Sequence, residues 1–466
     1  MATPAQILTS KFPYEPTGDQ QNFFRQTEEF IKSKEAKCTL LVKGYAGTGK
    51  TSVLSALVKV LPTFGYKSLL MAPTGRAAKV MARYTGRSAF TIHKVVYKLG
   101  ESRDTSDIQF KRQKNYHRNT VFIVDESSMI SEEGSQQKGV LWDLVTFVFE
   151  NAGNKLMLIG DDAQLPPVGQ SFSLALSRDH LQEKYGLAVM EVALKMVMRQ
   201  ALNSGILENA TKLRDSISSN SNDIQFSTAK SDVYRMLGQR MEDGLRYAYD
   251  KHGLGETIVI CRSNKNAVEY NRHIRHAIFY FENELECGDQ IMVVKNNYYY
   301  QPEHSPMGFL ANGDFAEVLK IKRFQEMYGL RFADVEIRLL DDPTNTALEV
   351  KIILDTLHSH SPALTLEAYN ELYSEVLKDY REITNRTKLR AALKKDPFLQ
   401  ALQVKFAYAL TCHKSQGGQW KAIFLDQGYV PDTQLSKDHL RWLYTGATRA
   451  TEELFLVNFD SSYFIS

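Results

Sequence analysis

Few cysteines and no long apolar run characterise this sequence of 466 residues. The cysteines stand far apart without a C-x-x-C pair, so the sequence indicates neither a disulfide framework nor a zinc site. We expect buried free thiols in a reducing compartment at Cys38, Cys261, Cys287 and Cys412. No apolar stretch approaches the ~20 residues that span a bilayer, and the start of the chain lacks the apolar core of a signal peptide. We therefore expect a cytoplasmic protein with no membrane partner.

An excess of one charge is also missing. Lys+Arg 57 against Asp+Glu 54 gives a formal net charge of +3, which neither requires nor excludes a polyanionic partner. A hydrophobic content of 43% and a charged content of 24% are typical of a globular protein. The sequence has no visible repeat or low-complexity tract, and its length predicts two to four domains of ~100–200 residues.

The most informative stretch is Gly44-Tyr-Ala-Gly-Thr-Gly-Lys-Thr51, which matches the pattern G-x-x-x-x-G-K-[ST]. An apolar run before it predicts a strand at 38–42, and helical spacing after it predicts a helix at 52–61. Its glycines let successive N–H groups face phosphate oxygens, its lysine suits β/γ-phosphates and its threonine suits Mg²⁺. A glycine turn with an unrelated lysine is the alternative. The predicted contacts are Gly44, Ala46, Gly47, Thr48, Gly49, Lys50, Thr51 and Ser52.

Two carboxylates end a second apolar run, Val121-Phe-Ile-Val-Asp125-Glu126. On a strand end, Asp125 can hold Mg²⁺ through water and Glu126 can orient the attacking water. A capping acid pair is the alternative. A third predicted strand, 155–159, leads to Gln164, which could bond a γ-phosphate or the lytic water, or could be a polar turn group.

The order of the elements predicts an α/β fold. Strands that alternate with helices imply a parallel sheet, whose ligands bind at the carboxyl ends of the strands. We expect residues 1–16 to be irregular because of their prolines, and Thr17-Gly-Asp-Gln20 to cap a helix. The second half predicts a strand at 257–261 and a second at 404–410. Between them, strands at 288–294 and 312–319 suggest a small barrel, and 362–402 is strongly helical.

Nine stretches, taken in order, resemble the motif set of superfamily 1 DNA helicases, and their residues are most similar to those of the RecD/Dda-like 1B branch. The motifs cover nearly the whole chain from Gln20 to Arg449, although 201–403 matches loosely. They are Gln20, GYAGTGKT, APTGRAA, TIHK, VDESS, GDDAQLPPVG, VMRQ, ALTCHKSQGG and LYTGATRA.

The resemblance implies two RecA-like P-loop domains with parallel sheets, ATP in the cleft between them and single-stranded DNA across their top. A small hairpin insertion and an SH3-like β-barrel insertion with a helical elaboration would complete the fold. The implied boundaries are 1–93 with 121–200 for domain 1A, 94–120 for a pin-like 1B, 201–287 with 404–466 for 2A, and 288–403 for 2B with its helical segment 362–402.

The resemblance also implies roles for single residues. Gln20 would read adenine, Gly417 would contact the nucleotide, and Arg199 and Arg449 would reach the γ-phosphate when the cleft closes. The implied catalytic set is Lys50, Asp125, Glu126, Gln164, Arg199 and Arg449, with Mg²⁺ at Thr51 and Asp125. The DNA contacts would be Pro73, Thr74, His93, Thr411, His413 and Lys414. The family often has histidine after APT, whereas this chain has Gly75, so the resemblance does not imply a base contact from this position, although it still implies the backbone contacts of Pro73 and Thr74.

These implications describe an ATP-dependent DNA helicase that moves 5′→3′ on single-stranded DNA and opens forked duplexes. We expect a monomer whose partners act in DNA replication, repair or recombination. Two alternatives stay open: a DNA-stimulated ATPase switch, and a helicase-like subunit of a nuclease complex without unwinding of its own. Strand displacement would separate the first from a helicase, and the intact Lys50, Asp125, Glu126 and Arg449 argue against the second.

Overall fold

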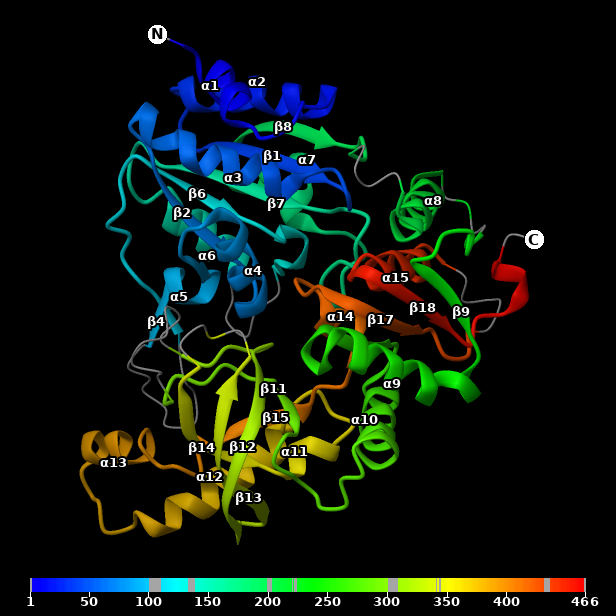
Figure 1. The fold of residues 1–466 in the computed structure, drawn as a ribbon. Helices are drawn as coiled ribbons and strands as arrows, with labels where there is room; N and C mark the ends of the chain where they lie inside the picture. The colour runs from blue at the N-terminus through cyan, green and yellow to red at the C-terminus, as the bar shows by residue number, and fades with distance from the viewer. Residues whose placement is uncertain are drawn as a thin grey trace.

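The computed structural model describes residues 2–99, 110–132, 139–198, 203–219, 221, 224–300, 309–340, 342, 345–430 and 436–464. Figure 1 shows two α/β units beside each other and a barrel that lies below both. In the described part of the chain, no helix is both long and apolar enough to cross a membrane.

The first unit is a six-stranded sheet in which every adjacent pair is parallel, in the order β3-β2-β6-β7-β1-β8. These strands are β1 (Cys38–Gly44), β2 (Lys67–Ala72), β3 (Ala89–Thr91), β6 (Thr120–Val124), β7 (Lys155–Gly160) and β8 (Ala188–Leu194). The three central strands β1, β6 and β7 are apolar on both faces because helices cover the sheet from both sides.

Helices of the first unit divide between the two faces of its sheet. One core joins the sheet to α1 (Pro4–Lys11), α2 (Gly18–Lys32), α3 (Lys50–Val60) and α4 (Gly75–Thr85). The other core joins it to α5 (Ile92–Val96), α6 (Val140–Val148) and α7 (Arg178–Tyr185). Single 3₁₀ turns lie at η1 (Leu61–Phe64), η2 (Ser127–Met129) and η3 (Leu174–Leu176).

Helix α1 corrects the expectation that residues 1–16 are irregular. Thr3 forms a capping box with Gln6, in which each side chain accepts a hydrogen bond from the other's backbone N–H. Pro4 occupies the first turn, where a helix has no use for its missing N–H. Leu8 is fully buried in the core beneath, so packing holds a helix that the prolines had argued against.

A short hairpin extends from the first unit at the position predicted for the pin. Strand β4 (Tyr97–Leu99) follows α5 directly and pairs antiparallel with β5 (Phe110–Arg112). Arg112 forms an ion pair with Glu150 at 3.1 Å, which ties the base of the hairpin to the end of α6. Residues 100–109 of the predicted pin, 94–120, lie outside the described residues.

The second unit repeats the parallel design with five strands in the order β16-β10-β17-β18-β9. They are β9 (Val233–Met236), β10 (Thr257–Cys261), β16 (Ala409–Thr411), β17 (Trp420–Asp426) and β18 (Ala450–Val457). One face packs on α8 (Gly205–Ser219) and α15 (Lys437–Ala447), and the other on α9 (Met241–His252) and α10 (Asn264–His273). Short elements are α14 (Cys412–Ser415), the π turn η7 (Ile274–Ile278), η5 (Gly238–Arg240), η6 (Leu254–Glu256) and η9 (Ser461–Tyr463).

The predicted small barrel is present as a closed five-stranded barrel. Its strands are β11 (Gln290–Val293), β12 (Phe315–Met327), β13 (Leu330–Leu339), β14 (Ala347–Ile353) and β15 (Leu402–Phe406). The predicted helical segment forms α12 (Leu366–Asp379) and α13 (Arg386–Leu393), preceded by α11 (Asp355–His358). Leu372, Val376 and Leu393 pack against Phe332 of the barrel, so the helical segment is an outer layer of the barrel.

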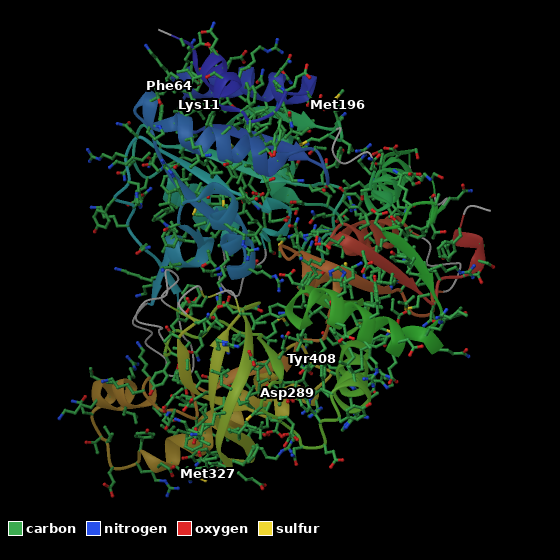
Figure 2. All side chains as sticks on the ribbon, viewed as in Figure 1. Lys11, Phe64, Met196, Asp289, Met327 and Tyr408 are labelled. Atoms are coloured by element: carbon green, nitrogen blue, oxygen red, sulfur yellow. The ribbon has the colours of Figure 1, made fainter. Side chains whose placement is uncertain are left out.

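The single strand predicted at 404–410 is wrong in one respect, because two strands occupy this stretch. Strand β15 closes the barrel, whereas β16 pairs with β10 in the second sheet. Between them, the Tyr408 hydroxyl donates to buried Asp289 at 2.9 Å. Figure 2 labels both residues where the barrel meets the second unit. Asp289 also holds Arg275 at 2.8 Å, so a buried polar network marks the crossover.

Candidate functional site

The glycine loop lies at the carboxyl edge of the first sheet, between β1 and α3. Strand β1 pairs with β7 and β8, which fixes the loop at this edge. Gly47 and Gly49 have φ of +75° and +82°, in the left-handed region that favours glycine. A Cβ on Gly44 would lie 2.7 Å from the Lys50 Cγ, so the close approach of the lysine also requires glycine.

The Lys50 ammonium folds back over this loop. It donates to the carbonyls of Gly44 at 2.5 Å and Tyr45 at 2.9 Å. Thr51 is exposed in the first turn of α3, and Ser52 is partly exposed beside it. Both therefore present hydroxyls at the helix N-terminus, where phosphate oxygens and a cation are stabilised.

The predicted acid pair follows β6 at the same edge. Asp125 accepts from the Tyr84 hydroxyl at 2.6 Å and from the Glu126 N–H at 2.9 Å. Burial raises the pKa of Asp125, and the neighbouring Glu126 raises it further. Glu126 is a non-glycine residue with φ of +51°, a costly backbone conformation of the kind that clusters at functional sites.

A third carboxylate lies at this edge, and the sequence analysis did not predict it as a site residue. Asp161 follows β7, and burial raises its pKa, while nearby Lys50 opposes the shift. The available signal was the acidic pair after the predicted strand at 155–159, within the motif that supplied Gln164. Two buried carboxylates facing one lysine indicate a site that further positive charge would stabilise.

The residues present fit a magnesium nucleotide. Among the described residues, no group of three or more His, Cys, Asp and Glu side chains could hold a metal ion by itself. Mg²⁺ is usually held by one or two carboxylates together with phosphates and waters, so Asp125 and Thr51 suit it. Gln164 adds an orphaned group: its buried Oε1 has no hydrogen-bond partner among the described residues, as expected for an atom that meets a ligand or water.

Gln20, predicted to read adenine, is buried against the glycine loop. Its Nε2 donates to the Thr48 carbonyl at 3.2 Å, and its Oε1 accepts from the Thr17 N–H at 3.0 Å. The second contact belongs to the capping box of α2, which confirms the predicted helix cap. Arg199 lies outside the described residues, although the Met198 N–H just before it donates to the Gly47 carbonyl at 3.0 Å.

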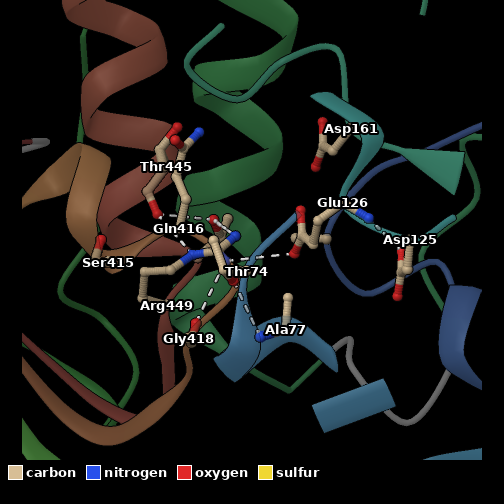
Figure 3. Close-up of polar contacts among 12 residues, drawn as sticks. Thr74, Ala77, Asp125, Glu126, Asp161, Ser415, Gln416, Gly418, Thr445 and Arg449 are labelled. Carbon is tan, nitrogen blue, oxygen red and sulfur yellow. Dashed lines mark hydrogen bonds and ion pairs between the residues drawn. The ribbon is translucent and has the colours of Figure 1, made fainter. Parts of the chain in front are cut away.

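Arg449 reaches the acid pair from the second unit, as Figure 3 shows. Its Nη1 lies 3.7 Å from the Glu126 Oε1, and the side chain is 5% exposed. It also donates to the carbonyls of Thr445 and Gly418, at 3.2 and 3.4 Å, and to the Thr448 hydroxyl at 3.4 Å, and these bonds hold the guanidinium in place from its own unit. The structure therefore brings residues more than 300 positions apart into one cleft.

The loop after α14 packs tightly on the first unit. A Cβ on Gly417 would lie 2.8 Å from the Ala77 Cβ and 3.2 Å from the Thr74 Oγ1. Gly417 was predicted to contact the nucleotide, and the structure places it against the start of α4. Arg76, which sequence reasoning did not single out, has its guanidinium 4.0 Å from the centre of the Trp420 ring.

The residues predicted to contact DNA lie at strand ends in both units. Pro73 and Thr74 follow β2 and His93 follows β3. Thr411 is the last residue of β16, and His413 and Lys414 follow that strand. His413 is exposed and His93 is partly exposed, so both rings are reachable from solvent. Partial burial lowers the pKa of His93 and so favours the neutral imidazole. Lys414 donates to Asn312 of the barrel at 3.0 Å.

A glycine loop with its lysine, an acid pair and an arginine from a second parallel sheet define a P-loop ATPase built from two RecA-like units. Two family models match the chain: an AAA domain over residues 19–233 and a UvrD-like helicase C-terminal domain over residues 406–457. The ATP-dependent DNA helicase dda of Enterobacteria phage T4 is 24% identical and covers 95% of this chain and 99% of its own length. These similarities agree with the resemblance of its motifs to the RecD/Dda-like branch of the superfamily 1B helicases.

Other similar proteins cover most of the chain. The RecBCD enzyme subunit RecD of Buchnera aphidicola is 22% identical over 89% of this chain and 69% of its own length. Among solved structures, the Pif1 helicase from Bacteroides in complex with ADP-AlF3 and ssDNA is 16% identical, with a TM-score of 0.49. The match covers 97% of this chain and 94% of that one.

Proposed function

We propose that this ATP-dependent DNA helicase hydrolyses Mg·ATP in the cleft between its two units and moves 5′→3′ on single-stranded DNA. The observation that carries the proposal is the contact of Arg449 with Glu126 across the cleft, at 3.7 Å. An arginine that arrives from a second unit can stabilise the charge of phosphoryl transfer when the units close.

Each residue of the cleft has a role that its position supports. Lys50 would leave the loop carbonyls for the β/γ-phosphates, and Thr51 and Asp125 would hold Mg²⁺, which neutralises phosphate charge. Glu126 would accept the proton of the attacking water, and Gln164 would orient that water or the γ-phosphate. Gln20 would read the adenine. Gly417 would contribute to the nucleotide site indirectly, because its loop packs closely against α4 at the interface between the units.

The strand would cross both units. Contacts at the ends of β2 and β3 belong to the first unit, and contacts at the end of β16 to the second, so each cycle of closure would move one set relative to the other. We propose 1–93 with 121–200 as domain 1A, 94–120 as the pin, 201–287 with 404–466 as domain 2A and 288–403 as domain 2B. The sheets and the barrel support these boundaries.

We also propose the setting in which the protein works. All four cysteines are free, and three are buried, which supports a reducing compartment such as the cytoplasm. We propose that it acts as a monomer on single-stranded and forked DNA, with partners from replication, repair or recombination.

Strand displacement on a forked duplex tests the proposal. We expect unwinding that requires ATP and a divalent cation, and Lys50→Ala should reduce it on the order of 10²-fold or more because the mobile charge at the phosphates is lost. Lys394→Ala, an exposed lysine on the outer helical segment, is the matched control and should unwind normally. DNA-stimulated hydrolysis without displacement would replace the helicase by an ATPase switch.

A further inference from the structure

One tyrosine of the second unit reaches across the cleft to the glycine loop itself. Tyr444 lies in the last turns of α15, and its side chain packs in the hydrophobic core of the second unit, where it is 1% exposed. Its hydroxyl nevertheless contacts two residues of the first unit. The ring therefore packs in the second unit, whereas the hydroxyl forms its hydrogen bonds with the first unit.

The two contacts of this hydroxyl have opposite polarity. It donates to the Asp161 Oδ2 at 2.6 Å and accepts from the Ala46 N–H at 3.0 Å. Ala46 is the third residue of the glycine loop, and Asp161 follows the strand next to β1. One hydroxyl thus joins the phosphate-binding loop to a buried carboxylate and joins both to α15.

Burial makes this arrangement costly to break. Burial raises the pKa of Asp161, and burial together with that carboxyl raises the pKa of Tyr444 well above its ordinary value. The tyrosine therefore keeps its proton at neutral pH and can donate it in a hydrogen bond. A bond to a buried carboxylate is stronger than one between neutral groups, and its loss leaves the carboxylate without that donor.

Neighbouring contacts tie the same first-unit segment to the second unit. The Thr445 hydroxyl accepts from the Leu165 N–H at 2.8 Å, and the Gln416 amide donates to the Leu165 carbonyl at 2.8 Å. Figure 3 shows Thr445 and Gln416 on the ribbons of the second unit, beside Arg449. The segment from Asp161 to Leu165 also contains Gln164, so these cross-unit bonds flank a predicted catalytic residue.

We propose that Tyr444 is a positioning residue that couples closure of the cleft to the state of the glycine loop. Its hydroxyl holds Ala46 and Asp161 against α15, so a change in the loop reaches the helix that carries Thr445 and ends beside Arg449. The position of the ATP site in this proposal rests on the proposed function. The connection between the two units rests only on the contacts of the Tyr444 hydroxyl.

The distance between the units without nucleotide or DNA tests the proposal. Fluorescent dyes on an exposed native cysteine, Cys287, and on Glu29→Cys in α2 report this distance. Tyr444→Phe removes the hydroxyl and keeps the ring, so both of its hydrogen bonds are lost. We expect the ratio of closed to open molecules to fall about tenfold or more, because one bond to a carboxylate has an equilibrium effect of about tenfold. Distances identical to those of the parent chain would overturn the proposal.

Two further variants keep this test specific. Tyr249→Phe removes a buried hydroxyl of the second unit that has no hydrogen-bond partner among the described residues, so it should leave the distance unchanged. Asp161→Ala should open the cleft, and adding it to Tyr444→Phe should open it little further, because both remove the hydrogen bond between Tyr444 and Asp161. Fully additive shifts would contradict a shared bond. Because no readout uses ATP, a parent chain without helicase activity would leave this result intact.

Discussion

Arg449 is almost fully buried, and the carboxylate it faces belongs to the other unit. Its guanidinium lies 3.7 Å from Glu126, a distance that closure around a nucleotide can change. Arg449→Ala should reduce turnover by ~10³–10⁵ while ATP affinity changes much less, because the arginine acts on charge that develops in the transition state. Turnover and nucleotide binding, measured on the same preparation, check this. Equal losses in both would assign Arg449 to binding.

Glu126 occupies a backbone conformation that few residues adopt without a reason. Its φ of +51° directs the chain out of β6 into η2, while its backbone N–H donates to Asp125. Glu126→Gln keeps the shape of the side chain but cannot accept a proton, so the variant should bind ATP normally and lose hydrolysis by 10²-fold or more. Equilibrium binding and single-turnover hydrolysis check this, and a variant that fails to bind ATP would remove Glu126 from the chemical step.

At the scale of elements, the strand contacts lie on two short helices of similar design. His93 lies on α5 after β3, and His413 on α14 after β16, one in each unit. His93→Ala or His413→Ala should weaken binding of single-stranded DNA and DNA-stimulated ATPase. Each should spare basal ATPase, because the predicted phosphate contacts belong to the glycine loop and the start of α3. Titration with labelled oligonucleotide measures the first effect. Unchanged DNA affinity in both variants would identify these residues as structural.

Sequence patterns predicted the elements around the glycine loop well because their signals are local. The strand, the loop and α3 follow each other within one stretch, and β10 begins and ends where predicted. Helix α1 was missed because prolines discourage a helix in general but not in its first turn. The β15 and β16 boundary was missed because partners far away in the sequence, β11 and β10, decide where each strand ends.

The candidate site shows the same division between local and long-range information. Motif spacing placed Lys50, Asp125 and Glu126 at one sheet edge. It could not place Tyr84 beside Asp125 or Tyr444 beside Asp161, because these tyrosines reach their partners from helices elsewhere in the chain. From the sequence alone, a tyrosine in a helical pattern is interpreted as a core residue, because the pattern does not show which group its hydroxyl contacts.

At the scale of the whole molecule, the two α/β units lie side by side and the barrel lies below them, as Figure 1 shows. The barrel contacts the first unit through the ion pair of Lys79 with Asp314 at 3.2 Å. The hairpin of β4 and β5 follows His93 directly and belongs to the first unit. A strand-separating element in this hairpin would reach the duplex ahead of the rest of the protein only if the first unit faces the duplex.

The position of the hairpin in the first unit relates the direction of translocation to the arrangement of the two units. If the 5′ end of the strand lies over the second unit, as the resemblance to the 1B branch implies, movement toward the 3′ end would carry the first unit and its hairpin forward. Movement in the opposite direction would need a separating element in the second half of the chain.

Two partial duplexes that differ only in the polarity of their single-stranded tail test the account most directly. With ATP and Mg²⁺, the protein should displace the strand of the 5′-tailed duplex and leave the 3′-tailed duplex largely intact, while Lys50→Ala should displace neither. Preferential opening of the 3′-tailed duplex would contradict both the direction and the role given to the hairpin, and displacement by Lys50→Ala at the parent rate would contradict the ATP-driven cleft itself.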